Sequence, residues 1–229
     1  MRELDRCALI ERSITKKYRK ELWNPFIGAV KRYRLIEENA VIAVPLDGSA
    51  EAFLAAKLLQ MLQRNTEIPF FLIYFPSAKE PSILSAITDI ALILHIPLSA
   101  PAAQSEPYTL VQSVTMDTVI AATVADLLYC GKLQAVLPRE TRDGVRRIRP
   151  LYAIQTANIE KWRRYNELSF PVRHTPDPQR QAARELIDRL KQNDPDIERN
   201  IFHSIHAVCM DTFPGYQTAE ERHTFLEKY

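Results

Sequence analysis

Short apolar runs alternate with helical patterns between residues 41 and 129, and this alternation constrains the fold more than any other feature of the sequence. The runs 41–44 (VIAV) and 70–75 (FFLIYF) have the continuous apolar character of parallel strands that are buried on both faces. Helical patterns separate and follow these runs, over residues 52–63, 82–94 and 117–129. Two further strands are expected, one near Leu98 and one over residues 108–114. Strands and helices in this order build βαβ units, so we predict an α/β fold with an open, mostly parallel sheet.

Helices are expected before and after this sheet along the chain. Apolar residues recur at helical spacing near the N-terminus, namely Leu9, Ile10, Ile14, Tyr18 and Leu22. Asn24-Pro25 is typical of an N-cap followed by proline in the first turn, so a second helix should begin there. Later segments are expected to be extended over 147–152, helical over 156–165, 179–192 and 195–208, and a tail from 209. We therefore divide the chain into N-terminal basic helices (1–36), an α/β domain (37–155) and a small C-terminal helical region (156–229).

Several protein classes are excluded by composition. No apolar run approaches the roughly 20 residues that a membrane helix needs, and the N-terminus lacks the pattern of a secretory signal, so we expect a cytoplasmic protein without membrane contact. Cys7, Cys130 and Cys209 are scattered and form no CxxC pair, which argues against a disulfide framework and a cysteine-bound metal. His203 and His206 share a face of an expected helix, and with Asp211 they leave a metal site as an alternative.

Charge is unevenly distributed, although the net charge is only +2. Residues 1–34 carry ten Lys and Arg against four Asp and Glu, whereas residues 35–110 carry three against eight. A basic arm favours a polyanionic partner such as a nucleic acid, and the alternative is an ordinary solvated helix face. The candidate RNA contacts are Lys16, Lys17, Arg19, Lys20, Arg146, Arg147 and Arg149. For Arg149, a packing role with a buried stem is the alternative.

Four aromatic residues are expected in the core rather than as stacking platforms: Trp23, Phe26, Trp162 and Tyr165.

Six segments carry a resemblance to a known family, in the same order along the chain. They are IERSITKKYRKELWNPF, VIAVPLDGSAEAFLAAKLL, LLYCGKLQAVLP, IRPLY, IEKWRRYN and PQRQ. Together they resemble the tRNA cytidine 2-thiolation proteins (TtcA family) of the PP-loop ATP pyrophosphatase superfamily. The resemblance implies an adenine nucleotide alpha-hydrolase-like fold, ATP with Mg²⁺, an iron–sulfur cluster and a tRNA substrate.

The loop that binds ATP in this family departs from the family pattern. Where the family has Ser-Gly-Gly-Lys-Asp-Ser, this chain has Asp47, Gly48, Ser49, Ala50, Glu51 and Ala52. The lysine is lost, and two carboxylates stand where a polyphosphate would bind, although one glycine and a helix start remain for a weak anion nest. A plain strand-to-helix turn is the alternative. The nucleotide-contact candidates are Asp47, Gly48, Ser49, Glu51 and Asp117, and we expect residues 45–51 to lie beside the helix that starts at Asp117, at the carboxyl edge of the sheet.

Other family motifs are also missing. Of the second signature, Gly-His-His-x-Asp-Asp, only Asp117 is matched, and helix capping is its alternative role. Residues 100–107 and 172–176 occupy the places of the two CxxC pairs and contain no cysteine. We therefore expect no iron–sulfur cluster, no catalytic residues, and a relative that has lost thiolation and binds a nucleotide, RNA or protein. The alternative is an active Mg-dependent, nucleotide-using enzyme of tRNA modification. A homodimer and a protein partner both stay open.

Overall fold

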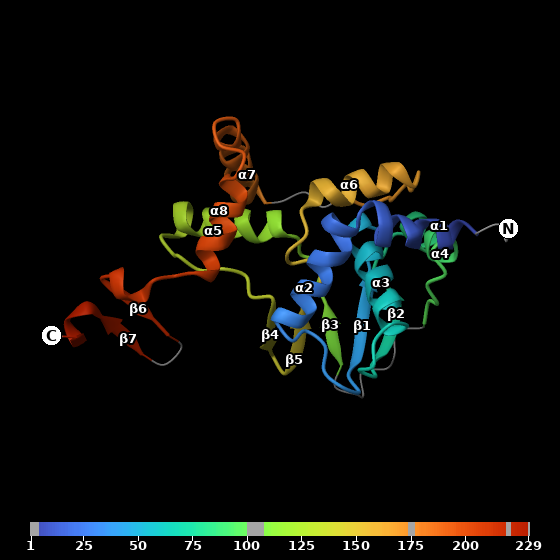
Figure 1. Cartoon of the computed structure of the whole chain (residues 1–229), viewed down its shortest axis with the longest axis horizontal. Coiled ribbons are helices and arrows are strands. Elements are labelled where there is room, and N and C mark those ends of the chain that lie inside the picture. Colours follow the sequence, from blue (N-terminus) through green and yellow to red (C-terminus); the bar gives the residue numbers. More distant parts are fainter. Residues whose placement is uncertain (1–4, 100–107, 174–176, 219–220, 229) are drawn as a thin grey trace. The chain divides into compact units, whose positions relative to one another are not determined.

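The computed structural model describes residues 5–99, 108–173, 177–218 and 221–228. The chain divides into two compact units, Met1–Glu185 and Leu186–Tyr229. In the first unit, five strands form one sheet in the order β2-β1-β3-β5-β4 (Figure 1). They are β1 (Val41–Leu46), β2 (Phe71–Pro76), β3 (Thr109–Val111), β4 (Arg139–Arg142) and β5 (Val145–Ile148). All neighbours pair in parallel except β4, which is antiparallel to β5, so the predicted mostly parallel α/β fold is confirmed.

Helices surround this sheet where the periodicity predicted them. The first unit contains α3 (Ala50–Gln63), α4 (Pro81–Ile93), α5 (Met116–Cys130) and α6 (Thr156–Tyr165), and α7 (Pro178–Lys191) continues beyond its boundary. Helix α3 is buried on nearly all sides and packs against β1, β2 and α6. A helix that is apolar all round belongs in a core, and its Phe53, Leu54 and Leu58 are fully buried.

The N-terminal arm differs from the expected pair of helices. It runs through α1 (Arg6–Arg12), two π-helical turns (Ser13–Lys17 and Arg19–Trp23) and α2 (Asn24–Arg32). Asn24 has helical backbone angles and Trp23 before it is the N-cap residue of α2, so the predicted N-cap is wrong. The physical reason lies in the spacing: apolar residues recur every four positions from Ile10 to Phe26. An α-helix would rotate such a row by about 40° per repeat, and the wider π-helical turns keep Ile10, Leu22 and Phe26 buried on one face.

Three expectations about strands need correction. Leu98 makes only an isolated bridge to Tyr74, and the strand expected over 108–114 is limited to β3. Strand β4 was not foreseen, because its sequence RETR is polar, as suits an exposed edge strand. It pairs with β5 through Asp143 and Gly144, which both have positive φ as a tight two-residue hairpin requires. The extended segment expected over 147–152 is therefore the end of β5, and only its first residues belong to the sheet.

The second unit contains α8 (Ile197–His206), within the helix expected over 195–208. It also contains a hairpin of β6 (Gly215–Gln217) and β7 (Arg222–Thr224), where a tail was expected. The division into regions 1–36, 37–155 and 156–229 stays a prediction. No helix in the described part of the chain is long and apolar enough to cross a membrane.

Strands β1 and β3 are parallel neighbours, so their carboxyl ends meet at one edge of the sheet. The loop 47–49 follows β1 and the start of α5 follows β3, as expected from the sequence. We call this the carboxyl edge, and the opposite edge, where β1 and β2 begin, the amino edge.

Candidate functional site

The turn after β1 is closed by its own side chains. Asp47 Oδ1 accepts hydrogen bonds from Ser49 N at 2.8 Å and from Ser49 Oγ at 2.6 Å. Ser49 Oγ in turn accepts from Ala52 N at 3.2 Å and so caps α3. A carboxylate that binds the N–H two residues on is the usual Asx turn. Two backbone N–H groups at the start of α3 are therefore already occupied by Asp47 and Ser49.

A segment from much later in the chain covers the same turn. Gly48 has φ of +93°, and a Cβ there would lie 3.1 Å from side-chain atoms of Ile83, Pro171 and Val172. Val172 N donates to Gly48 O at 3.3 Å, and Ser49 forms a parallel bridge with Val172. We call residues 170–172 the cover. Gly48 thus provides the positive φ and the close approach that allow apolar side chains to pack on the loop.

Phe170 and Glu51 complete the surroundings of this loop. The ring of Phe170 packs on Phe53 of α3, with 5.6 Å between centroids. Glu51 is partly exposed in the first turn of α3, where the helix dipole favours a carboxylate. The site therefore brings Asp47 and Glu51 near one helix start, with an apolar cover above Gly48.

Asp117 lies in the first turn of α5, and its carboxylate binds the first residue of α6. Its Oδ2 accepts a hydrogen bond of 2.6 Å from Thr156 N, the first residue of α6. Thr115 Oγ1 lies 3.0 Å from Thr156 Oγ1 and 3.1 Å from Thr118 Oγ1. Asp117 starts its own helix, as the alternative held, but its side chain binds the first N–H of α6 instead of capping α5.

A groove of about 550 Å³ lies between the N-terminal arm and the end of α6. Its lining includes Arg6, Leu9, Ile10, Arg12, Ser13, Lys16, Lys17, Tyr165, Asn166 and Glu167, and we call it the basic groove. Lys17 Nζ lies 3.4 Å from the centroid of the Tyr165 ring, a cation–π contact, and Tyr18 meets that ring edge-on at 5.9 Å. Arg19 and Lys20 are exposed on the same arm but do not line the groove.

Tyr165 corrects the expectation that all four aromatic residues are core residues. Trp162 and Phe26 are fully buried, whereas Tyr165 is 53% exposed. Because Tyr165 is the last residue of α6, it lies beyond the packed face of the helix. Spacing alone did not distinguish it from Trp162.

The arginines of β5 and the segment after it make internal contacts. Arg146 pairs with Glu37 and donates to Arg34 O at 3.2 Å. Arg147 donates to Arg142 O at 3.2 Å. Arg149 is 5% exposed, pairs with Glu140 and donates to Leu137 O. This matches the packing alternative for Arg149, and an RNA-contact role for the three residues stays a prediction.

The sequence analysis missed a buried cluster of polar groups around Lys57. Lys57 in α3 is fully buried, and its Nζ lies 2.6 Å from Glu11 Oε1, 2.7 Å from Leu94 O and 3.1 Å from Cys7 Sγ. Burial raises the pKa of the Cys7 thiol, against the opposing effect of the Lys57 ammonium. Burial also opposes ionisation of Glu11, but hydrogen bonds from Lys57 and Arg64 outweigh it and hold the pKa of Glu11 below its usual range. The one sequence feature that could have indicated this burial is a lysine inside the otherwise apolar run AFLAAKLL.

The described residues do not fit an iron–sulfur cluster, which needs several thiolates together. Cys7 is buried against Lys57, Cys130 is exposed at the end of α5, and Cys209 belongs to the second unit. Within the described ranges, no three His, Cys, Asp or Glu side chains gather as a metal would require, and this includes His203, His206 and Asp211. Residues 100–107 and 174–176, which take the place of most of the family's cysteine segments, lie outside the described residues.

Comparisons with known proteins point to one class. No protein-family model matches the chain. It is 23% identical over 235 residues to the tRNA-cytidine(32) 2-sulfurtransferase of Geobacter metallireducens, covering 84% of this chain and 91% of that protein. The corresponding protein of Geobacter sulfurreducens is 21% identical, covering 82% of this chain and 90% of its own length.

Among solved structures, the U34-tRNA thiolase NcsA from Methanococcus maripaludis with its 4Fe–4S cluster matches with a TM-score of 0.57 and 16% identity. The match covers 80% of this chain and 77% of that one. Over most of its length the chain is therefore similar to the tRNA-cytidine(32) 2-sulfurtransferases, which confirms the resemblance to the TtcA family, and it has the fold of a tRNA thiolase.

Proposed function

We propose that this chain is a tRNA-binding relative of the sulfurtransferases that has lost nucleotide-dependent thiolation. The observation that carries the proposal is the closed turn at the carboxyl edge, where Asp47 binds Ser49 N and the cover packs on Gly48. This is the loop that the resemblance assigns to ATP. In this chain the Asp47 carboxylate and the apolar side chains of the cover already occupy the positions that a polyphosphate would need.

The electrostatics of the turn support this reading. A phosphate nest works through unoccupied backbone N–H groups at a helix start. Here the carboxylate of Asp47 takes the position of an anion on Ser49 N, and Glu51 adds a second negative charge nearby. Two like charges about 4 Å apart repel by roughly 4 kcal/mol at an effective dielectric of 20. An incoming polyphosphate would meet this repulsion without the lysine that the family uses to offset it.

The basic groove supports the RNA half of the proposal. Arg6, Arg12, Lys16 and Lys17 line it with one acidic residue, Glu167, among the described lining residues. Cationic side chains neutralise phosphates, and exposed aromatic rings stack on unpaired bases. Tyr165 offers such a ring beside Lys17. The similarity to tRNA-modifying enzymes makes tRNA the natural candidate among RNAs.

Catalysis is tested by incubating the chain with ATP, Mg²⁺ and tRNA and measuring pyrophosphate and AMP. We expect no release above the protein-free blank, with a working tRNA-cytidine(32) 2-sulfurtransferase as the positive control. Turnover by the wild-type chain would overturn the loss of activity and favour the Mg-dependent enzyme instead.

RNA binding is tested by titrating tRNA at two salt concentrations. The double variant Lys16→Ala/Lys17→Ala should bind at least tenfold more weakly, with a smaller salt slope, because each lost phosphate contact lowers the slope by about 0.7 to 0.9. The matched control, Lys79→Ala/Lys132→Ala, removes the same charge from exposed positions away from the groove. Equal effects in both variants would place tRNA elsewhere, and no binding at low salt would favour a protein partner.

A further inference from the structure

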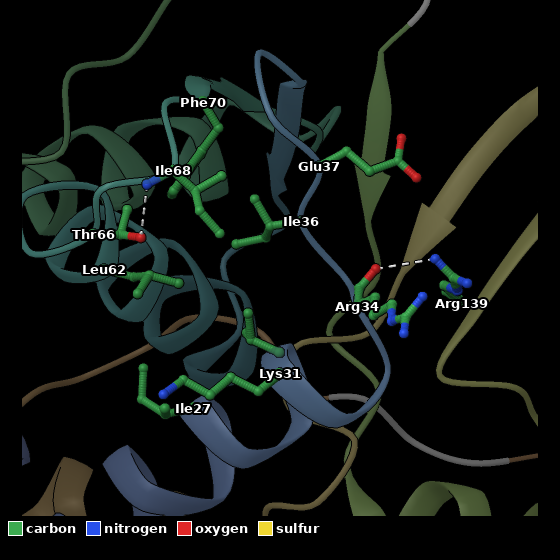
Figure 2. Close-up of a pocket in the computed structure, with 11 residues that line it drawn as sticks. Ile27, Lys31, Arg34, Ile36, Glu37, Leu62, Thr66, Ile68, Phe70 and Arg139 are labelled. Atoms are coloured by element: carbon green, nitrogen blue, oxygen red, sulfur yellow. Dashed lines mark hydrogen bonds between the residues drawn. The ribbon is translucent and has the colours of Figure 1, made fainter.

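A second pocket, of about 510 Å³, lies at the amino edge of the sheet, away from the loop discussed above (Figure 2). It is lined by Ile27, Val30, Lys31, Arg34, Ile36, Glu37, Leu62, Thr66, Ile68, Phe70 and Arg139. These residues come from the end of α2, the turn before β1, the end of α3, the turn before β2, and β4. We call it the amino-edge pocket. Its volume falls within the range of about 300 to 1,000 Å³ that is usual for small-molecule sites.

The walls of the amino-edge pocket are apolar. Ile27, Ile36, Leu62 and Ile68 line it, and the buried Phe70 lies next to Ile68 (Figure 2). The side chains of Ile27, Ile36 and Leu62 are partly buried, and Ile68 is 49% exposed. An apolar ligand would complete the burial of these surfaces, at roughly 25 cal/mol for each Å² removed from water.

Cations from three different elements border this apolar interior. They are Lys31 in the last turn of α2, Arg34 in the following turn and Arg139 on β4. Among the described lining residues Glu37 is the one acid, and it pairs with Arg146 outside the pocket. The helix dipole explains a cation at Lys31. It does not explain Arg139, which a different part of the chain brings to the same pocket.

The carbonyl oxygen of Arg34 joins the end of α2 to arginines of β4 and β5. Arg34 has φ of 48°, in the left-handed region that bulky residues seldom adopt at the end of a helix. This conformation presents Arg34 O to Arg139 Nη1 at 3.1 Å, a contact visible in Figure 2, and to Arg146 Nη2 at 3.2 Å. The conformation also ends α2, because Leu35 N donates to Val30 O at 3.1 Å as in the usual left-handed helix ending.

We propose that the amino-edge pocket binds a small amphipathic carboxylate, with its apolar body against Ile36, Leu62 and Ile68 and its head group at Arg34 and Arg139. Guanidinium groups bind carboxylates through paired hydrogen bonds, and both Arg34 and Arg139 line the pocket. Glu37 is paired with Arg146, so the rim presents mainly the positive charges of Lys31, Arg34 and Arg139 to the head group. The inference is independent of the proposed function, since it uses neither the loop at the carboxyl edge nor the basic groove.

The first experiment is calorimetric titration of the full chain with hexanoate, octanoate and decanoate. Each added pair of methylenes should tighten binding by roughly fifteenfold until the pocket is full, because each buried methylene contributes about fourfold. 1-Decanol should bind at least tenfold more weakly than decanoate, and decyltrimethylammonium more weakly still. Equal binding of decanol and decanoate would overturn the role of the arginines, and tighter binding of decyl phosphate would overturn the choice of a carboxylate.

The second experiment uses variants. Arg139→Gln and Arg34→Asn should each weaken decanoate binding at least tenfold while leaving decanol binding unchanged; asparagine tolerates the left-handed backbone at position 34. The control is Arg142→Gln, which makes the same charge change on β4 but does not line the pocket. Amide chemical shifts of Ile36 and Ile68 should move on addition of decanoate. Equal loss in Arg139→Gln and Arg142→Gln, or shifts confined to other regions, would refute the site.

Discussion

The two edges of the sheet carry opposite arrangements. At the carboxyl edge, Asp47, Ser49 and the cover fill the turn after β1, and Gly48 is buried. At the amino edge, a pocket of about 510 Å³ opens between apolar walls and three cations. Open α/β sheets usually bind ligands at the carboxyl edge. In the described part of the chain, the turn at the carboxyl edge is closed by its own side chains, whereas the amino edge presents a pocket with apolar walls.

Helix α3 connects these two arrangements. It begins at the Asp47–Ser49 turn and ends beside Leu62, which lines the amino-edge pocket. Between them, Lys57 ties the helix to the N-terminal arm through Glu11 and to the end of α4 through Leu94 O. Both edges therefore depend on how firmly α3 is held, and changes along it separate the contributions of the two edges.

The largest effect is expected for Lys57→Met. The substitution keeps the volume of the side chain but leaves Glu11 without its buried partner, which typically costs about 3 to 5 kcal/mol. Arg64, which is half exposed, also pairs with Glu11, so we expect a value near the lower end of that range. Chemical unfolding in urea measures it. Arg64→Met is the control and should cost less than about 1 kcal/mol; similar losses in the two variants would contradict a dominant role for Lys57.

A smaller effect is expected for Gly48→Ala at the carboxyl edge. The added Cβ would lie 3.1 Å from three side chains and would also disfavour the φ of +93°. The backbone alone accounts for about 1 to 2 kcal/mol, and crowding against Pro171 and Val172 should raise the loss to about 2 to 3 kcal/mol.

The control for Gly48 is Gly131→Ala, since Gly131 also has positive φ but has no atoms within 4 Å of the added Cβ. The difference between the two variants in urea unfolding isolates the packing of the cover. If Gly48→Ala loses no more stability than Gly131→Ala, the cover is not packed on the loop in solution, and the contrast between the two edges fails.

A feature of this molecule is predictable from the sequence when it depends on residues close together in the chain, and less so when it depends on residues far apart. Buried parallel strands are apolar on both faces, so β1 and β2 were evident as continuous runs. Strand β4 is polar because it lies at an edge, and only its Asp143-Gly144 turn signalled a hairpin. The apolar residues at every fourth position of the N-terminal arm were read as ordinary helical spacing, and the slight excess of their period over that of an α-helix, which accompanies the π-helical turns, was missed.

The candidate sites were less predictable for the same reason. Sequence similarity identified Asp47–Glu51 and Asp117, but the contacts of Gly48 with Pro171 and Val172 join residues far apart in the chain. No local pattern encodes such a contact. The amino-edge pocket likewise combines residues from five separate segments, and none of them is unusual alone.

The smallest effect concerns the β4 strand that supplies Arg139 to the amino-edge pocket. The hydrogen bond from Arg149 outweighs partial burial and holds the pKa of Glu140 below its usual range. A carboxyl whose pKa is lowered in the folded state stabilises the protein above its unfolded-state pKa of about 4.3, and this contribution is lost as the pH falls. Glu140→Gln should therefore cost about 1 kcal/mol at pH 7 and progressively less toward pH 3. Urea unfolding across this range measures it. The Glu38→Gln control, at an exposed position, should leave the pH profile unchanged. A constant loss at all pH values would mean that Glu140 acts by packing, and the anchor of β4 at the amino edge would then not be its ion pair with Arg149.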